Sequence, residues 1–98
     1  MKTKPVAKFF EKRFRKKSFR RIYQEERYLI SIGVAIAEAR EKSHLSQNEL
    51  GKRLGTTQSV VSRIENGNQN LTLNMLAKIA YILHCELSLQ MRPWRLAA

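Results

Sequence analysis

Apolar side chains recur at helical spacing through most of this chain, and the clearest pattern lies in residues 45–67. There the spacing predicts two short helices joined by a tight turn. Ser46 and Glu49 are three residues apart, as in a capping box, so the first helix should begin at Gln47. Gly55 should end that helix, because glycine adopts the left-handed conformation of a helix C-terminus at little cost.

The second of these helices is predicted to have one apolar and one polar face. Thr56 or Thr57 can cap its N-terminus. Val61 and Ile64 are three residues apart and should point into the core. The opposite face carries side chains of the kind that hydrogen-bond to base edges and phosphates, namely Gln58, Ser59, Ser62 and Arg63.

Helical spacing continues on both sides of this two-helix segment. From Phe19 to Arg40 the apolar positions fit one long helix, or two helices with a break near residues 26–28. Downstream, Thr72 can cap a further helix that carries apolar residues as far as Leu83. The sequence therefore predicts a helical domain built around residues 45–67.

The end of the chain has a different periodicity. Residues 86–92 alternate polar and apolar side chains with period two, which predicts a β-strand that Pro93 ends. A single strand on a helical domain leaves its edges unpaired, and the simplest partner is the same strand of a second subunit. Trp94 can cover that contact or touch another partner. The residues predicted to form the dimer contact are Leu87, Leu89, Met91 and Trp94.

Length, charge and cysteine content restrict the possible classes of protein. The 98 residues suffice for one small domain. The net charge of +11 is largest in residues 1–28, which hold 11 Lys or Arg against 3 Glu. This excess favours polyanions, and by itself it fits DNA, RNA or an anionic membrane. No apolar run approaches the ~20 residues of a membrane span. The single Cys85 excludes an internal disulfide and fits a reducing cytoplasm.

Catalytic and metal-binding chemistry is not predicted. The sequence contains no aspartate, and its two histidines, His44 and His84, are far apart. His84 and Cys85 are neighbours, but two adjacent ligands without further partners cannot complete a tetrahedral site. The chain offers neither paired carboxylates for a metal nor a nucleophile with its base. We therefore expect no enzyme, no metal site and no cofactor.

Two runs of residues carry a resemblance to a known family. Residues 55–58 (GTTQ) and 65–67 (ENG) resemble the helix-turn-helix of the lambdoid repressor and Cro family, also called the XRE family. With flanking helices the resemblance covers about residues 29–84. It implies an all-α, lambda-repressor-like domain of four to five helices, with an N-terminal helical extension and the short C-terminal strand. The expected divisions are a basic, partly disordered or partner-binding extension at 1–24, the DNA-binding domain with its dimerisation strand at 25–92, and a tail at 93–98.

The resemblance also implies how the motif would contact double-stranded DNA, because in this family the second helix enters the major groove by its N-terminal end. Gln58 and Ser59 would lie deepest, and glutamine suits adenine because its amide donates to N7 and accepts from N6. Ser62 and Arg63 lie one turn further, where Arg63 can bind guanine or a phosphate. Gln47 would contact the sugar-phosphate backbone, as glutamine commonly does there in this family. Weaker phosphate candidates, which could equally be solvated surface, are Thr57, Lys52, Arg53 and Asn68.

An ion pair and a dimer follow from the same resemblance. Arg40 lies late in the helix before the motif and Glu65 ends the recognition helix, positions that pair in such proteins. We expect a structural pair rather than a catalytic one. A homodimer would hold two recognition helices about 34 Å apart and require a pseudo-palindromic operator.

Within the family, the chain is most similar to antitoxins of bacterial type II toxin–antitoxin modules, of the HigA-like or HipB-like kind. The similarity rests on residues 19–26, the single small domain and the terminal strand. It implies repression of the antitoxin's own operon and a toxin partner, such as a RelE- or HigB-type mRNA-cleaving protein or a HipA-type protein. The residues predicted to contact this partner are Phe10, Phe14, Phe19 and Tyr23.

The alternative is a stand-alone XRE-family repressor or phage regulator. In that case the basic residues 1–17 would add affinity for DNA through its phosphates. In the antitoxin, the same positive charge would repel a basic toxin unless it meets an acidic face. The sequence leaves both uses of this arm open.

Overall fold

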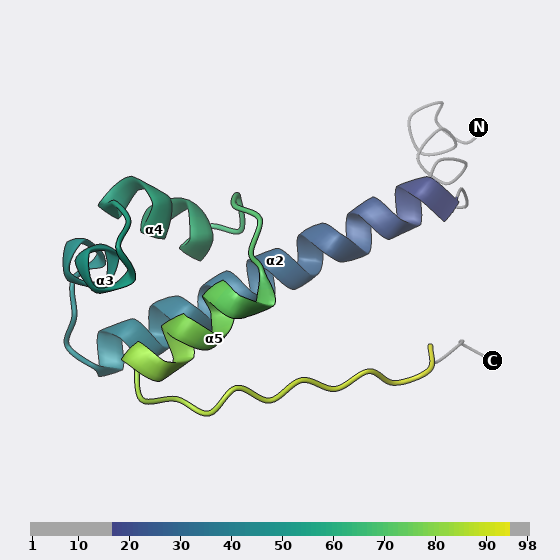
Figure 1. Ribbon diagram of the computed structural model, residues 1–98. Helices are drawn as coiled ribbons and strands as arrows, with labels where there is room; N and C mark the ends of the chain where they lie inside the picture. The colour runs from purple at the N-terminus through teal and green to yellow at the C-terminus, as the bar shows by residue number, and fades with distance from the viewer. Residues whose placement is uncertain (1–16, 95–98) are drawn as a thin grey trace.

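The computed structural model describes residues 17–94, and this part of the chain is helical (Figure 1). A long helix is followed by three shorter ones. Their bounds are α2 Lys17–Lys42, α3 Gln47–Leu54, α4 Gln58–Glu65 and α5 Leu73–Ile82. The predicted all-α class is confirmed. None of these helices combines the length and apolarity that crossing a membrane needs.

α2 is one continuous helix of 26 residues, without a break near residues 26–28. Its C-terminal half packs against α4, whereas its N-terminal half projects beyond the other helices (Figure 1). Gly33 marks the closest approach of α4, since a Cβ there would lie 2.5 Å from the carbonyl oxygen of Ile64. The helix passes through residue 24 without interruption, and the division of the chain at that residue stays a prediction.

One apolar core joins the four helices. Val61 and Ile64, the α4 residues predicted to point inward, are both buried. Removing a side chain of this size from water stabilises the fold by about 1.5–3 kcal/mol. Leu45, in the connection between α2 and α3, is partly buried against the same cluster. The core consists of Ile36, Leu50, Leu54, Val61, Ile64, Ile79 and Leu83.

The helix ends confirm the capping predictions. The Ser46 hydroxyl accepts from the backbone N–H of Glu49 at 3.0 Å, and the Glu49 carboxylate accepts from the N–H of Ser46 at 2.7 Å. The capping box of α3 is therefore complete. Gly55 ends α3 with a φ of 78°, the left-handed region that glycine enters freely. Thr57 rather than Thr56 caps α4, and its hydroxyl accepts a backbone N–H three residues on at 3.2 Å.

The predicted strand over residues 86–92 is wrong for the single chain. No strand occurs in residues 17–94, and the segment after α5 turns back and continues as an unpaired stretch (Figure 1). Alternation is insufficient because the backbone N–H and C=O groups of a strand need a neighbouring strand. The apolar members of the alternation, Leu87, Leu89 and Met91, are exposed, as is Trp94. The dimer contact assigned to these residues involves a second subunit and stays a prediction.

Candidate nucleic-acid interface

α4 presents a polar face on the side opposite the core. Gln58 and Ser59 in its first turn and Arg63 in its last are exposed, and Ser62 is partly buried. These positions share a face because residues three and four apart are neighbours on a helix. Val60 is partly buried against the core, which assigns it to packing. The predicted hydrogen-bonding side chains therefore lie together on one surface.

The corner between α3 and α4 is compact and fixed by backbone contacts. A Cβ at Gly51 would lie 3.0 Å from the carbonyl carbon of Thr57, so the two helices meet closely there. The N–H of Gly55 donates to the carbonyl of Lys52 at 3.1 Å, and the N–H of Thr56 donates to that of Gly51 at 2.8 Å. The two hydrogen bonds close the C-terminal end of α3, and the approach of Gly51 to Thr57 brings the start of α4 against it.

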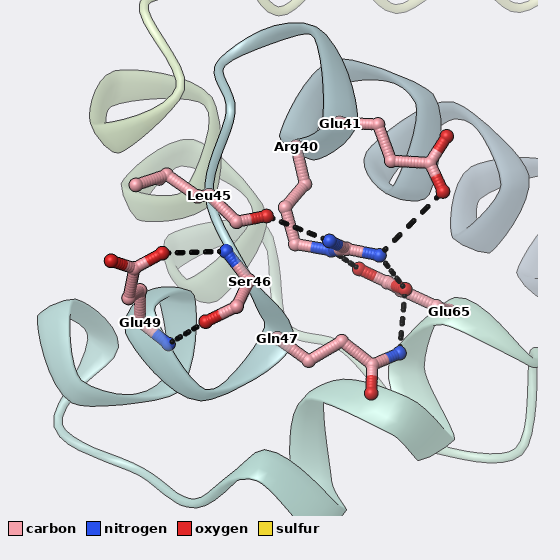
Figure 2. Close-up of polar contacts among 7 residues, drawn as sticks. All are labelled: Arg40, Glu41, Leu45, Ser46, Gln47, Glu49 and Glu65. Carbon is pink, nitrogen blue, oxygen red and sulfur yellow. Dashed lines mark hydrogen bonds and ion pairs between the residues drawn. The ribbon is translucent and has the colours of Figure 1, made fainter.

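A cluster of polar side chains fixes the C-terminal end of α4 (Figure 2). Arg40 Nε donates to Glu65 Oε2 at 2.6 Å, and Arg40 Nη2 donates to Glu65 Oε1 at 3.1 Å. Arg40 Nη1 donates to the carbonyl oxygen of Leu45 at 2.8 Å. The Arg40 and Glu65 side chains are 12% and 7% exposed. The hydrogen bond with Glu65 raises the pKa of Arg40 above its usual value, so the guanidinium stays charged.

Gln47 joins this cluster from the first position of α3. Its Nε2 donates to Glu65 Oε1 at 2.9 Å (Figure 2), so Glu65 connects α2, α3 and α4. The bond uses one of the two hydrogens on the amide nitrogen. The second hydrogen and the amide oxygen have no partner in the described part of the chain. The cluster thus fixes the Gln47 side chain and leaves one hydrogen of its amide nitrogen available to a ligand.

The capping box beside Gln47 affects the titration of Glu49. The hydrogen bond from the backbone N–H of Ser46 lowers the pKa of Glu49, and the Ser46 hydroxyl contributes in the same direction. The carboxylate is therefore ionised at neutral pH while it caps α3. Its negative charge also suits the positive end of the helix dipole.

Arg63 is held by a residue that the sequence analysis did not single out. Its Nε donates to Oε1 of Gln69, in the loop between α4 and α5, at 3.1 Å. Asn68, a weaker phosphate candidate, is exposed in the same loop, and its backbone N–H donates to the carbonyl of Arg63 at 2.8 Å. No periodicity marks a loop glutamine, so only the three-dimensional turn after α4 brings Gln69 back to Arg63.

The residues predicted to bind a protein partner do not lie on the polar face of α4. Phe10 and Phe14 fall outside the described residues. Phe19 is partly buried and Tyr23 is exposed on the projecting half of α2, where the Arg27 guanidinium lies 5.8 Å from the Tyr23 ring centroid. A partner bound at Tyr23 would leave α4 accessible, because the projecting half extends away from that helix (Figure 1).

Metal ligation has no support in the described residues. No group of three His, Cys, Asp or Glu side chains among residues 17–94 could hold a metal ion. Cys85 is exposed, and its thiol donates to the carbonyl oxygen of Leu83 at 3.5 Å. Its position after α5 is that of an ordinary helix-end residue.

Comparison with known proteins identifies the class. Residues 36–90 match the helix-turn-helix family, and this match covers more than half of the chain. The chain belongs to the XRE-type helix-turn-helix family of DNA-binding regulators.

The chain is also similar to the ImmF control region 10 kDa protein of Bacillus phage phi105. The two are 33% identical over 57 residues, which are 58% of this chain and 63% of the phage protein. The match therefore spans less than two thirds of the phage protein's length.

Proposed function

We propose that this protein is a sequence-specific transcriptional repressor that reads double-stranded DNA with α4. The observation that carries the proposal is the polar face of that helix on a rigid support. Arg40, Gln47 and Glu65 tie the helix to α2 and α3, and discrimination between bases depends on donors and acceptors held at fixed positions. The phage phi105 relative supports a regulatory use, because its name refers to a control region.

In this proposal the N-terminal end of α4 enters the major groove. Gln58 reads adenine through N6 and N7, and Ser59 lies beside it. Gln47 uses its free amide hydrogen on a phosphate, and exposed Thr57 and Asn68 lie near the same strand. The phosphate contacts set the register of the protein on the duplex, and the base contacts supply its specificity.

We further propose that the repressor acts as a homodimer on a pseudo-palindromic operator. Leu73, Ala77 and Tyr81 are exposed at i, i+4 and i+8 along α5, and Tyr81 is 83% exposed. We call these three residues the α5 stripe. A second copy can bury it in a twofold-symmetric contact, with Leu87 and Leu89 of the following segment beside it. The two α4 helices would then lie about 34 Å apart.

Selection of bound sequences from a random duplex pool tests this function. The expected result is a pair of related half-sites. Gln58→Ala should lose its preference at one base pair in each half-site, at a cost of roughly 1–3 kcal/mol, with nonspecific affinity nearly unchanged. The matched control is Gln24→Ala, the same replacement on the projecting half of α2. Absence of any enriched sequence, or equal weakening on all duplexes by Gln58→Ala, would contradict the proposal.

A second candidate is an antitoxin that binds a toxin and represses its own operon. The projecting half of α2 favours a protein partner, because it exposes the large apolar side chains Ile22 and Tyr28 besides Tyr23. A helix with exposed apolar anchors is a common protein-docking element. The toxin would be an mRNA-cleaving protein of the RelE or HigB type, or a HipA-type protein.

Two measurements separate these candidates. If residues 1–16 serve DNA, their deletion should lower operator affinity and flatten its salt dependence, because phosphate contacts release counterions. For an antitoxin, operator binding should survive Tyr23→Lys and Tyr28→Lys, whereas copurification with the product of the adjacent reading frame should be lost. Copurification that survives both substitutions would exclude the α2 surface as the toxin site.

A further inference from the structure

The contact between Arg63 and Gln69 ties a predicted DNA-contacting side chain to a loop. Arg63 is exposed in the last turn of α4, and Gln69 is partly buried in the loop that follows. The bond joins Arg63 Nε to Gln69 Oε1 at 3.1 Å. A glutamine oxygen is an acceptor only, so it orients the guanidinium through this one N–H.

The loop that carries Gln69 is itself anchored. The backbone N–H of Asn68 donates to the carbonyl of Arg63 at 2.8 Å. Gly67 has a φ of 77° and sits against α2, where a Cβ would lie 2.7 Å from Cγ1 of Ile30. Gln69 therefore approaches Arg63 from a backbone that both α2 and α4 hold in position.

The bond determines which donors of Arg63 remain for a ligand. A guanidinium has five N–H donors in a planar fork. Because Gln69 occupies the Nε hydrogen, the edge of the guanidinium formed by Nε and one terminal nitrogen is not available to a ligand. The end-on edge, formed by one N–H of each terminal nitrogen, stays available. Two parallel donors of this kind match the O6 and N7 acceptors of guanine.

The position of Arg63 on α4 favours a base over a phosphate. Arg63 lies four residues after Ser59, so the two side chains lie one above the other on the polar face. Ser59 belongs to the first turn of α4, the end that enters the groove under the proposed function. Fixing the side chain in advance also reduces the conformational entropy lost on binding.

We propose that Gln69 is a positioning residue for DNA specificity, and that it sets the end-on edge of Arg63 against a guanine in each half-site of the operator. This inference rests on the proposed function and adds to it a particular base and the residue that makes its recognition selective. Gln69 itself acts through Arg63.

The experiment measures affinity for the selected operator and for variants with one base pair replaced in each half-site. Arg63→Ala first locates the base pair that Arg63 reads. We then expect Gln69→Ala to reduce the preference for guanine at that same pair by about three- to tenfold, with affinity for random duplex and the salt slope unchanged. Gln69→Glu keeps an oxygen acceptor for Nε and should retain most of the preference. Asn70→Ala, an exposed neighbour in the same loop, is the matched control.

Other outcomes overturn the inference in distinguishable ways. Equal weakening on all duplexes by Gln69→Ala, with a salt slope reduced by about one, would make Arg63 a phosphate contact. An unchanged guanine preference in Gln69→Ala would remove Gln69 from recognition. If the protein binds selectively but the base pair located by Arg63→Ala carries no guanine, this inference is overturned and the proposed repressor function still stands. Loss of all sequence preference in the native protein would end both proposals.

Discussion

Glu65 is the residue on which the support of α4 depends. Its carboxylate is 7% exposed and accepts hydrogen bonds from Arg40 and Gln47. A charge removed from water to this degree is stable only with such partners. Removing either member of the ion pair leaves the other one uncompensated.

Glu65→Ala should therefore destabilise the fold by about 3–5 kcal/mol. The measurement is the free energy of unfolding from urea denaturation, with Glu86→Ala, an exposed glutamate, as the matched control. Replacing the pair together, as Arg40→Met with Glu65→Leu, should recover much of the loss because no unpaired charge remains. A loss below about 0.5 kcal/mol for Glu65→Ala, the range of ordinary surface substitutions, would contradict this role.

Glu49 gives the capping box a pH dependence of known sign. Its pKa is lowered in the folded chain, mainly by the Ser46 N–H, so the folded state binds fewer protons than the unfolded state. The stability from this group is present above the ordinary glutamate pKa of 4.5 and is lost as the pH falls below that value and acid protonates the folded state. Glu49→Gln keeps a hydrogen-bonding side chain without a titrating group. As the pH is lowered over this window, the unfolding free energy of Glu49→Gln should fall less than that of the native protein. If the two proteins lose unfolding free energy equally with pH, the cap does not depend on the charge of Glu49.

Much of the residue-scale description is predictable from sequence because caps and cores follow local spacing. Ser46, Glu49 and Gly55 have their predicted roles, and Val61 and Ile64 are buried as expected. The contacts of Gln47 and Arg63 are different. Their partners lie 18 and 6 residues away in the chain, and exposed polar side chains have no periodicity that would identify such pairs.

At the scale of the elements, the crossing of α4 over α2 depends on Gly33. A Cβ at this position would lie 2.5 Å and 2.6 Å from the carbonyl oxygens of Ile64 and Glu65, which are backbone atoms of α4. The two helices would have to separate. The ion pair between Arg40 and Glu65 joins the same two helices and would be strained by that movement.

Gly33→Ala should therefore destabilise the fold by about 1–3 kcal/mol through overpacking. In an exposed helix interior the same replacement stabilises by about 0.5–1 kcal/mol, so the sign of the change is informative. Thermal unfolding measures it. Ser31→Ala, an exposed position on the same helix, should be neutral or slightly stabilising, and a stabilised Gly33→Ala would mean that α4 does not approach α2 as described.

Residues 86–92 illustrate where sequence reasoning fails at this scale. Alternation marks a segment whose polar and apolar side chains would point to opposite sides if it were a strand. It says nothing about whether another strand is available, and no strand is present in residues 17–94. Helices form their hydrogen bonds locally, and α3, α4 and α5 were accordingly predictable with accurate bounds. The continuity of α2 needed the structure, because both sequence alternatives fitted.

At the scale of the whole molecule, the proposed dimer depends on the α5 stripe. Tyr81→Lys should convert dimer to monomer, because a charge in the middle of an apolar contact must lose its hydration. Sedimentation equilibrium measures this change. The variant should still bind a single half-site, and its affinity for the full operator should fall toward that value. Asn74→Lys, also exposed on α5, is the control for added charge. If the Tyr81→Lys protein still sediments with the mass of a dimer, the dimer interface does not lie at the α5 stripe.

The projecting half of α2 places the N-terminal end of this helix well away from the recognition helix α4. A helix rises 1.5 Å per residue, so Lys17 begins about 24 Å along the axis from Gly33. The N-terminal end of α2 therefore lies about that far from the α2–α4 crossing. Residues inserted into this half of the helix would also rotate its N-terminal end about the helix axis. Two residues inserted into it would rotate the N-terminal end of α2 by about 200° around the axis, whereas seven would nearly restore the original direction at about 10 Å greater separation. An attached partner that must meet the same duplex would tolerate the second insertion better than the first.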